Sequence, residues 1–494
     1  GMAMAHWEIQ GWMILILGWV FVPFYSRSMV YTMPEFLERR YNPQSRTILS
    51  VISLVSYVLT KVAVTVYAGG LVFQQVFGIK ELWGIDFFWI AAIGLVVLTA
   101  LYTIFGGMKS VLYTSVLQTP ILLLGSLIIL VLGFKELGGW DEMMRVCGAV
   151  TVNDYGDTMT NLIRSNDDAN FPWLGALIGS AIIGFWYWCT DQFIVQRVLS
   201  GKNEKEARRG TIFGAYLKLL PVFLFLIPGM IAFALHQKYI GAGGEGFLPM
   251  LANGTANADA AFPTLVAKLL PAGVKGLVVC GILAALMSSL ASLFNSSAML
   301  FTIDFYKRFR PETPEKKLVG IGQIATVVIV ILGILWIPIM RSVGDVLYTY
   351  LQDVQSVLAP GIAAAFLLGI CWKRTSAQGG MWGLIAGMII GLTRLGAKVY
   401  YSNAGEVADS TFKYLFYDMN WLFFCGWMFL FCIIVVIVVS LATEAPTAEK
   451  IQGLVFGTAT KEQKAATRAS WDHWDIIHTV IILAITGAFY WYFW

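Results

Sequence analysis

Charged residues are scarce in this chain. Lysine, arginine, aspartate and glutamate make up 13% of its 494 residues, whereas hydrophobic residues make up 58%. A soluble globular protein of this length carries a charged fraction of about 25%. Apolar runs of roughly twenty residues, the length that crosses a bilayer as a helix, recur along the whole chain. The low charge therefore excludes a soluble protein and predicts an all-α polytopic membrane protein in the lipid bilayer, with no nucleic-acid partner.

Cysteine and histidine are also rare, with six and four residues respectively. Only Cys147 falls in a predicted loop, and no disulfide or metal-binding spacing is present. A membrane-embedded enzyme would need His, Asp or Ser grouped inside the spans, yet His236, His473 and His478 lie near span ends. The chain is therefore not expected to be an enzyme, although an embedded enzyme or a channel stays an alternative to a transporter.

The apolar runs predict twelve membrane spans. They cover about 9–25, 47–77, 87–105, 110–134, 173–197, 209–235, 272–306, 317–340, 344–371, 377–399, 418–441 and 473–494. Alternate connections carry 21 of the 34 lysines and arginines. Because basic loops stay on the cytoplasmic side, these connections are predicted to be cytoplasmic and the C-terminus external.

The beginning of the sequence is unusual for a polytopic protein. Gly1-Met-Ala-Met-Ala leads directly into Glu8 and a span, without a basic leader or a small-residue cleavage site. We expect a sequence shortened at its N-terminus.

Polar groups interrupt several spans. Residues 186–192 read Trp-Tyr-Trp-Cys-Thr-Asp-Gln directly after an apolar stretch, and Asp191 is costly at that depth unless it faces a cavity, a partner or a ligand. Three aromatic rings beside Thr, Asp and Gln suit a polar solute with an apolar face, such as a sugar.

Other ionisable residues occur inside apolar stretches. Lys61 lies more than ten residues from either end of its span, which favours a cavity, whereas Lys218 lies near a span start and fits snorkelling equally well. Asp191 and Glu8 are the natural countercharges, and Gln352 adds an uncharged donor and acceptor. Together these groups predict a polar cavity within the bundle.

The seventh span is rich in small residues. On spacing alone this pattern favours a helix-packing surface, although Ser288, Ser289 and the Ala285 carbonyl could offer oxygens to a small hard cation. Pro221, Pro228 and Pro360 are predicted to bend or break their helices.

Five motifs resemble the sodium/solute symporter family, and the sodium/glucose cotransporter branch in particular. They are the string at 186–199, Tyr-Leu-Lys-Leu-Leu-Pro at 216–221, Met-Ser-Ser-Leu-Ala-Ser-Leu-Phe-Asn-Ser at 287–296, Phe-Leu-Leu-Gly-Ile-Cys-Trp-Lys-Arg at 366–374 and Tyr-Thr-Met-Pro-Glu-Phe at 31–36. The similarity extends over essentially the whole chain.

The resemblance implies a LeuT-like inverted repeat of five plus five helices in one transporter domain. Residues 1–134 would be the remainder of the first repeat, 173–371 the second repeat, and 377–494 additional C-terminal helices. The first broken helix, which the family uses for part of its sugar and sodium sites, would be missing.

By position, the resemblance implies sites for both ligands. The sugar site would contain Glu8, Lys61, Tyr187, Trp188, Asp191, Lys218 and Gln352, with Phe193 as an aromatic inner gate. Ala285, Ser288 and Ser289 would hold sodium, which reverses the packing interpretation. Ser115 stands where the sugar branch typically has Asp, so a second cation site and the stoichiometry stay open. The implied activity is sodium-driven uptake of a glucose- or galactose-like hexose by alternating access, with inositol or another carbohydrate as the alternative.

Overall fold

The computed structural model describes residues 1–251, 254–343, 346–403 and 408–494, except the side chains at 102, 104–112, 114, 117 and 340–343. Eleven helical segments in these ranges are long and apolar enough to cross a membrane. They are Met2–Ser28, Pro43–Phe77, Gln118–Leu137, Trp173–Thr190, Glu204–Gly241, Ala272–Phe309, Glu315–Ile339, Leu347–Cys371, Ala377–Asn403, Trp421–Ala442 and His473–Tyr492. The predicted all-α, polytopic membrane architecture is confirmed.

The elements follow one another along the chain with a single short β-hairpin among them. In order they are η1 (Met2–Met4), α1 (Ala5–Glu8), α2 (Gly11–Ile16), η2 (Leu17–Phe21), α3 (Val22–Ser28), α4 (Met33–Arg40), α5 (Pro43–Ser56), η3 (Tyr57–Val62), α6 (Ala63–Phe77), β1 (Glu81–Leu82), β2 (Ile85–Asp86), α7 (Phe87–Leu137), α8 (Trp140–Gly148), α9 (Trp173–Gly184), η4 (Phe185–Thr190), α10 (Gln192–Leu199), α11 (Glu204–Pro221), η5 (Val222–Leu226), α12 (Ile227–Gly241), η6 (Ala258–Ala260), α13 (Ala261–Leu269), α14 (Ala272–Met299), η7 (Leu300–Tyr306), α15 (Lys307–Phe309), α16 (Glu315–Val343), α17 (Leu347–Cys371), α18 (Ala377–Asn403), α19 (Thr411–Lys413), η8 (Tyr414–Asp418), α20 (Trp421–Ala442), α21 (Ala448–Ile451), α22 (Lys461–Ala469) and α23 (His473–Tyr492).

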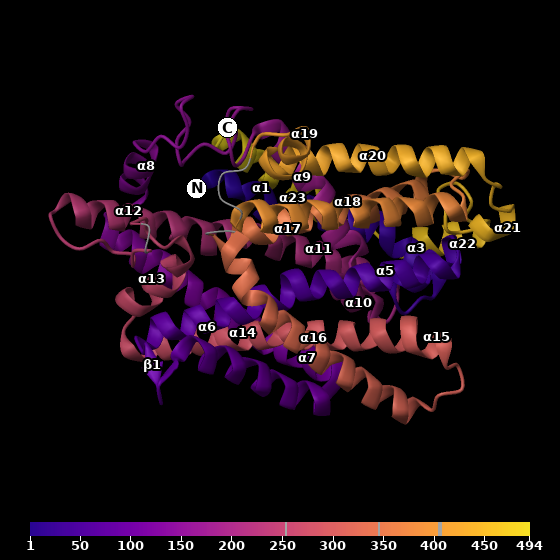
Figure 1. The fold of residues 1–494 in the computed structure, drawn as a ribbon, viewed down its shortest axis with the longest axis horizontal. Helices are drawn as coiled ribbons and strands as arrows, with labels where there is room; N and C mark the ends of the chain where they lie inside the picture. The colour runs from indigo at the N-terminus through magenta and orange to yellow at the C-terminus, as the bar shows by residue number, and fades with distance from the viewer. Residues whose placement is uncertain (252–253, 344–345, 404–407) are drawn as a thin grey trace.

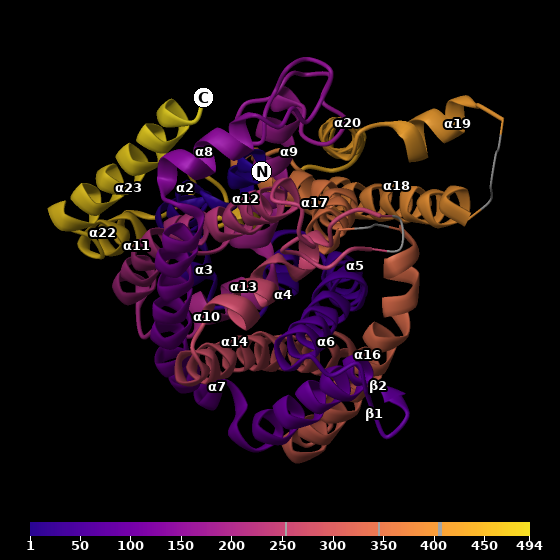
Figure 2. The same ribbon diagram turned by 90° about the vertical axis from the view of Figure 1, so that its left-hand side faces the viewer.

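The spans run along the long axis of the molecule, and both chain termini lie towards its left-hand end in Figure 1. The opposite end holds α15, α21 and α22, which belong to basic connections of the chain (Figure 1). Figure 2, viewed from the left-hand end, shows α18 and α20 on one side of the bundle and α7 with α14 on another.

Helix α7 contains two of the twelve predicted spans and the connection expected between them. The predicted connection at 106–109 is helical, so the expected spans at 87–105 and 110–134 form one 51-residue helix. A straight helix of that length would measure ~77 Å, far more than the ~30 Å hydrocarbon core. Figure 1 places β1, just before α7, and α8, just after it, at the same left-hand end, so α7 turns back on itself. Its apolar parts are Phe87–Leu101 and Gln118–Leu137, of which the first is shorter than the other spans.

One expectation is corrected, since Cys147 belongs to α8 rather than to a loop. Pro360 lies inside α17, which continues past it, so a bend at that residue stays a prediction. Pro221 ends α11 and is followed by the π-helical turn η5, and Pro228 lies in the first turn of α12. Both prolines lie within the continuous helical segment Glu204–Gly241, on either side of the π-helical turn η5.

Several spans contain a π-helical turn, in which one extra residue is inserted into the α-helical ladder. Among the described residues these turns are η2, η3, η4, η5, η7 and η8. Such insertions re-aim side chains and occur frequently at functional sites. η3 contains Lys61, and η4 is the Phe-Trp-Tyr-Trp-Cys-Thr string that precedes Asp191.

The segment around η4 lies where three apolar clusters of the core meet. Trp186 and Cys189 belong to one cluster, and Trp188 packs against that cluster and a second one. Phe193 belongs to the third, which also includes Tyr57. The fold thus places the most polar part of this span at the centre of the helix bundle.

Candidate functional site

Asp191 breaks its membrane span. Its backbone is extended, with φ −80° and ψ 127°, so the helical path stops after η4 and resumes as α10. The carboxylate caps the new helix by accepting a hydrogen bond from the Phe193 amide at 3.1 Å. A carboxylate at a helix N-terminus also interacts favourably with the helix dipole. The break thus fixes a charged group inside the bundle, where only 4% of the residue is exposed.

Lys61 from η3 forms an ion pair with this carboxylate, as the countercharge prediction expected. The Tyr57 hydroxyl donates to Asp191 Oδ1 at 2.9 Å, and the same hydroxyl accepts a hydrogen bond from the Phe193 amide at 3.1 Å. Tyr57 and Lys61 are four residues apart and therefore lie on one face of their helix. Breaking a buried ion pair costs ~3–5 kcal/mol, because it leaves a charge without compensation.

Aromatic rings surround the Lys61 ammonium. Its Nζ lies 4.3 Å from the ring centre of Phe193, 4.7 Å from Tyr57, 5.1 Å from Tyr187 and 5.9 Å from Trp186. Cations within ~6 Å of an aromatic face are stabilised by the ring quadrupole. Phe193 also lies 5.5 Å from the Arg197 guanidinium, so this ring is close to both cations.

A second acid–base group is built from three other helices. Lys218 of α11 donates to Glu8 Oε2 at 2.8 Å, and Glu8 is the other acid that the sequence offered as a countercharge. The Tyr348 hydroxyl of α17 donates to the other carboxylate oxygen of Glu8, also at 2.8 Å. Lys218 Nζ lies 5.6 Å from the ring of Trp188.

The aromatic string of η4 lies between the two pairs. Trp186 and Tyr187 contact the Lys61 side, whereas Trp188 contacts Lys218. Neighbouring rings of the string meet edge-to-face, with centroids 6.2 Å and 5.1 Å apart. Flat apolar surface is thereby flanked on each side by a carboxylate and an ammonium.

Gln352 supplies an acceptor without a partner. It lies on α17, one turn after Tyr348, and is 8% exposed. Among the described residues its buried Oε1 receives no hydrogen bond. A buried polar atom left unpaired costs ~1–3 kcal/mol, which makes Gln352 a candidate for binding a ligand that donates a hydrogen bond.

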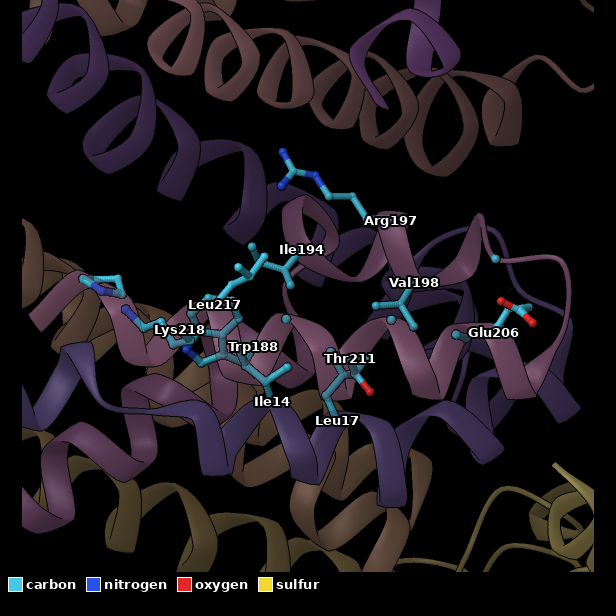
Figure 3. Close-up of a pocket in the computed structure, with 15 residues that line it drawn as sticks. Ile14, Leu17, Trp188, Ile194, Arg197, Val198, Glu206, Thr211, Leu217 and Lys218 are labelled. Atoms are coloured by element: carbon cyan, nitrogen blue, oxygen red, sulfur yellow. The ribbon is translucent and has the colours of Figure 1, made fainter. Parts of the chain in front are cut away.

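A cavity of about 520 Å³ reaches one end of this arrangement. Figure 3 shows Trp188 and Lys218 near one end of it and Glu206 near the other, with Thr211 between them. Of the predicted sugar-site residues, Trp188 and Lys218 line this cavity, whereas Lys61, Asp191 and Gln352 do not. Lys61 and Asp191 instead form an ion pair with each other.

The small-residue helix α14 carries the predicted cation ligands. It is continuous from Ala272 to Met299, so the Ala285 carbonyl is already engaged in the helix and offers only its second lone pair. Ser288 is buried, and its Oγ lies 2.6 Å from the Oγ of Ser115 on α7. The site thus offers neutral oxygens, the ligand type that hard cations prefer. In the described residues no group of three or more His, Cys, Asp or Glu could hold a metal ion.

Comparison with known proteins decides the family. The family model described as "Sodium:solute symporter family" matches residues 1–387. The chain belongs to this family. The symporter is 36% identical to the sodium/mannose cotransporter of Bos taurus, with 98% of this chain and 83% of the relative aligned. It is 35% identical to sodium/myo-inositol cotransporter 2 of Homo sapiens over 93% and 69% of the two chains. It is also 37% identical to sodium/glucose cotransporter 1 of Ovis aries, over 87% and 67%.

A solved structure supports the fold. The symporter superposes on a structure titled as the substrate-bound outward-open state of a Na⁺-coupled sialic acid symporter, with a TM-score of 0.67 and 21% identity over 90% of this chain and 84% of that one. At that identity the likeness concerns the fold alone, and the predicted LeuT-like fold is confirmed. The chain is therefore a multi-pass, sodium-coupled solute symporter.

The sequence missed the two tyrosines that complete the charged groups of the symporter. Tyr57 and Tyr348 each donate to one of the two carboxylates, Asp191 and Glu8. The signal that could have identified them is spacing, since each lies four residues before a predicted site residue, Lys61 or Gln352.

Proposed function

We propose that this symporter takes up a hexose or a hexose-like cyclic polyol together with sodium. The observation that carries the proposal is the aromatic string of η4 placed between two acid–base pairs, the first buried and the second half-buried. A sugar ring has one face of C–H groups and a rim of hydroxyls, and this arrangement offers partners for both. Relatives named for mannose, glucose and myo-inositol transport agree with a cyclic polyol as substrate.

Each residue has a role that follows from its chemistry. Asp191, Glu8 and the free Gln352 Oε1 would accept hydrogen bonds from hydroxyls, and Lys61 and Lys218 would donate to hydroxyl oxygens. Tyr187 and Trp188 would cover the apolar face of the ring. When the sugar binds, its hydroxyls replace part of the hydrogen bonding within each ion pair. The net affinity is therefore the free energy of the new sugar contacts minus the cost of breaking the contacts that the side chains make with one another.

Phe193 is proposed as the inner gate. Its ring centre lies 4.3 Å from the Lys61 ammonium and 5.5 Å from the Arg197 guanidinium, next to the helix break at Asp191. A rotation of this ring would open the way from Lys61 towards the cavity that Arg197 lines.

Ala285, Ser288 and Ser289 are proposed to hold the transported sodium. Sodium and sugar are coupled if both bind the outward-open state more tightly than the inward-open state, by a few kcal/mol each. The basic connections are proposed to be cytoplasmic and the C-terminus external. The division into 1–134, 173–371 and 377–494 as repeat one, repeat two and additional helices is part of the same proposal.

Uptake into proteoliposomes tests the proposal. Labelled glucose, mannose and myo-inositol are each offered under an inward sodium gradient and with choline in place of sodium. We expect saturable, sodium-dependent uptake of at least one of the three against its gradient. Uptake that ignores sodium would refute coupling, and flux that never exceeds equilibrium would indicate a channel.

A single substitution tests the sugar site. Gln352→Ala removes the unpaired acceptor, and loss of one neutral hydrogen bond lowers affinity by ~2–10-fold. The matched control is Gln452→Ala, since Gln452 is exposed and lies outside the spans. Equal half-saturation concentrations for both variants would exclude Gln352 from the site.

A further inference from the structure

A second cavity, unrelated to the candidate sugar site, opens on the outer face of the bundle. It has a volume of about 600 Å³ and lies between α5 with η3, η7 and α16. Leu54 and Val58 form one wall, Phe301 and Tyr306 the floor, and Ile324 and Val328 the other wall. The volume is in the range of ligand-binding pockets, ~300–1,000 Å³.

The lining of this groove suits a hydrocarbon chain. Apart from Tyr306 every lining residue is aliphatic or phenylalanine. Ile324 is 66% exposed and Val328 49%, so the groove faces the surroundings of the bundle along the length of α16. In a membrane-spanning helix those surroundings are lipid tails.

Cations gather where both walls of the groove begin. On α16, Lys317 lies one turn before Ile321 and therefore on the groove face, which continues through Ala325 and Val328. At the start of α5, Arg308 donates to the Pro43 carbonyl and to the Thr47 hydroxyl, and Thr47 is on the helix face that leads to Leu54 and Val58.

The whole connection between η7 and α16 is basic. Residues 307–317 contain five lysines and arginines and two acids, Glu312 and Glu315. Among the described residues none of these seven side chains takes part in an ion pair. The nearby Asp304 is buried and pairs with Arg46, which also binds Glu38. Exposed positive charge therefore remains at this end of the groove.

We infer that the groove binds an anionic phospholipid, with one acyl chain between α5 and α16 and its phosphate at Arg308 and Lys317. Charge complementarity selects this occupant, because a sterol has no phosphate to offer the basic end and the choline cation of a zwitterionic lipid offsets the charge of its phosphate. Basic residues next to a membrane attract anionic headgroups, and a basic pocket between helices adds geometry to that attraction. The lipid joins η7, which continues the proposed cation-binding helix α14, to α5, which leads into the η3 turn that holds Lys61.

Native mass spectrometry of the purified full chain tests the inference. The protein is titrated with phosphatidylglycerol and, separately, with phosphatidylcholine of identical acyl chains. We expect one retained phosphatidylglycerol that survives detergent competition, and no retained phosphatidylcholine. Replacing two charges, in Arg308→Gln/Lys317→Gln, should weaken phosphatidylglycerol binding by ~30-fold. The matched control, Lys461→Gln/Lys464→Gln on α22, removes two charges at the same end of the molecule and should leave binding unchanged.

The groove itself is tested by filling it. Ala325→Trp places a large ring between the walls and should abolish retention of phosphatidylglycerol while the basic residues stay intact. Thermal unfolding checks that Ala325→Trp is folded. If its unfolding temperature is lower than that of the parent chain, Val328→Trp is used instead. The inference is overturned if both lipids are retained equally, or if the groove-filled variant binds phosphatidylglycerol as before. It is also overturned if a sterol is retained instead, or if soluble glycerol phosphate alone displaces the phospholipid.

Discussion

Asp191→Asn is the most informative single change in this symporter. Asparagine keeps the size of the side chain, and its oxygen can still accept from the Tyr57 hydroxyl and the Phe193 amide. The substitution therefore preserves the cap of α10. What it removes is the charge that compensates Lys61, and it turns an amide N–H towards the ammonium.

The size of the effect follows from the surroundings of Lys61. An ion pair broken in the interior costs ~3–5 kcal/mol. Four aromatic rings with centres 4.3–5.9 Å from Nζ remain in place. A desolvated cation–π contact can contribute ~2 kcal/mol. We therefore expect a destabilisation near the lower end, ~3 kcal/mol, rather than loss of the fold.

Two readouts separate structure from function. Thermal unfolding in detergent measures stability, and sodium-driven sugar uptake in proteoliposomes measures transport. Asp191→Asn should lower both. The double variant Asp191→Asn/Lys61→Gln removes the uncompensated charge and should regain most of the thermal stability, yet it should remain inactive because the sugar has lost two partners.

The reasoning fails in two specific cases. If Asp191→Asn unfolds at the same temperature as the parent chain, the pair does not stabilise the helix break. If the double variant transports sugar normally, neither Lys61 nor Asp191 contacts the substrate, and the cation–π cage is only structural.

Two further predictions concern the cation and the pH dependence of stability. Ser115→Asp places a carboxylate beside Ser288, whose hydroxyl lies 2.6 Å from that of Ser115. The substitution should lower the sodium concentration for half-maximal uptake several-fold, and Ser115→Ala is the neutral control. An unchanged sodium dependence in the Asp variant would contradict a nearby cation site. Asp259 caps α17 by accepting from the Leu347 amide at 3.1 Å, and burial raises the pKa of its carboxyl from 3.8 to about 6. The folded state thus holds this proton more tightly, so the stability it contributes is complete below pH 3.8 and is lost as the pH rises through about 6; the difference amounts to at most ~3 kcal/mol. Asp259→Asn can still accept the Leu347 hydrogen bond and should flatten thermal stability across that pH range, an outcome that a persistent slope would exclude.

Much of the fold could be predicted from composition and hydrophobic runs alone. A bilayer admits only helices with internally satisfied backbones, so long apolar runs leave little choice of secondary structure. The differences concern continuity within helices. The connection expected at 106–109 is helical and belongs to α7, and α17 continues past Pro360.

The site was predicted in part. The charged residues inside the spans stand out in the sequence, because a charge in hydrocarbon has a high free energy unless it has a partner. Such residues therefore predict partners within the bundle. The sequence also named Asp191 and Glu8 as countercharges, although not which acid meets which lysine. Tyr187 and Phe193 were among the predicted site residues, whereas Tyr57 and Tyr348 were missed, because aromatic residues are common in every span and spacing from a site residue alone does not single them out.

The sequence by itself determined that this protein crosses a membrane many times, that its polar groups converge inside the bundle, and which family it belongs to. These conclusions rest on hydrophobicity and on motifs, which are local properties of the chain. Only the tertiary structure decided that Asp191 breaks its span, and that the η4 rings lie between two separate ion pairs. It also decided that Gln352 keeps a buried oxygen without a partner and that a basic-ended groove opens between α5 and α16. Each of these depends on contacts between helices far apart in the chain, whose geometry is set by packing and not by any one segment.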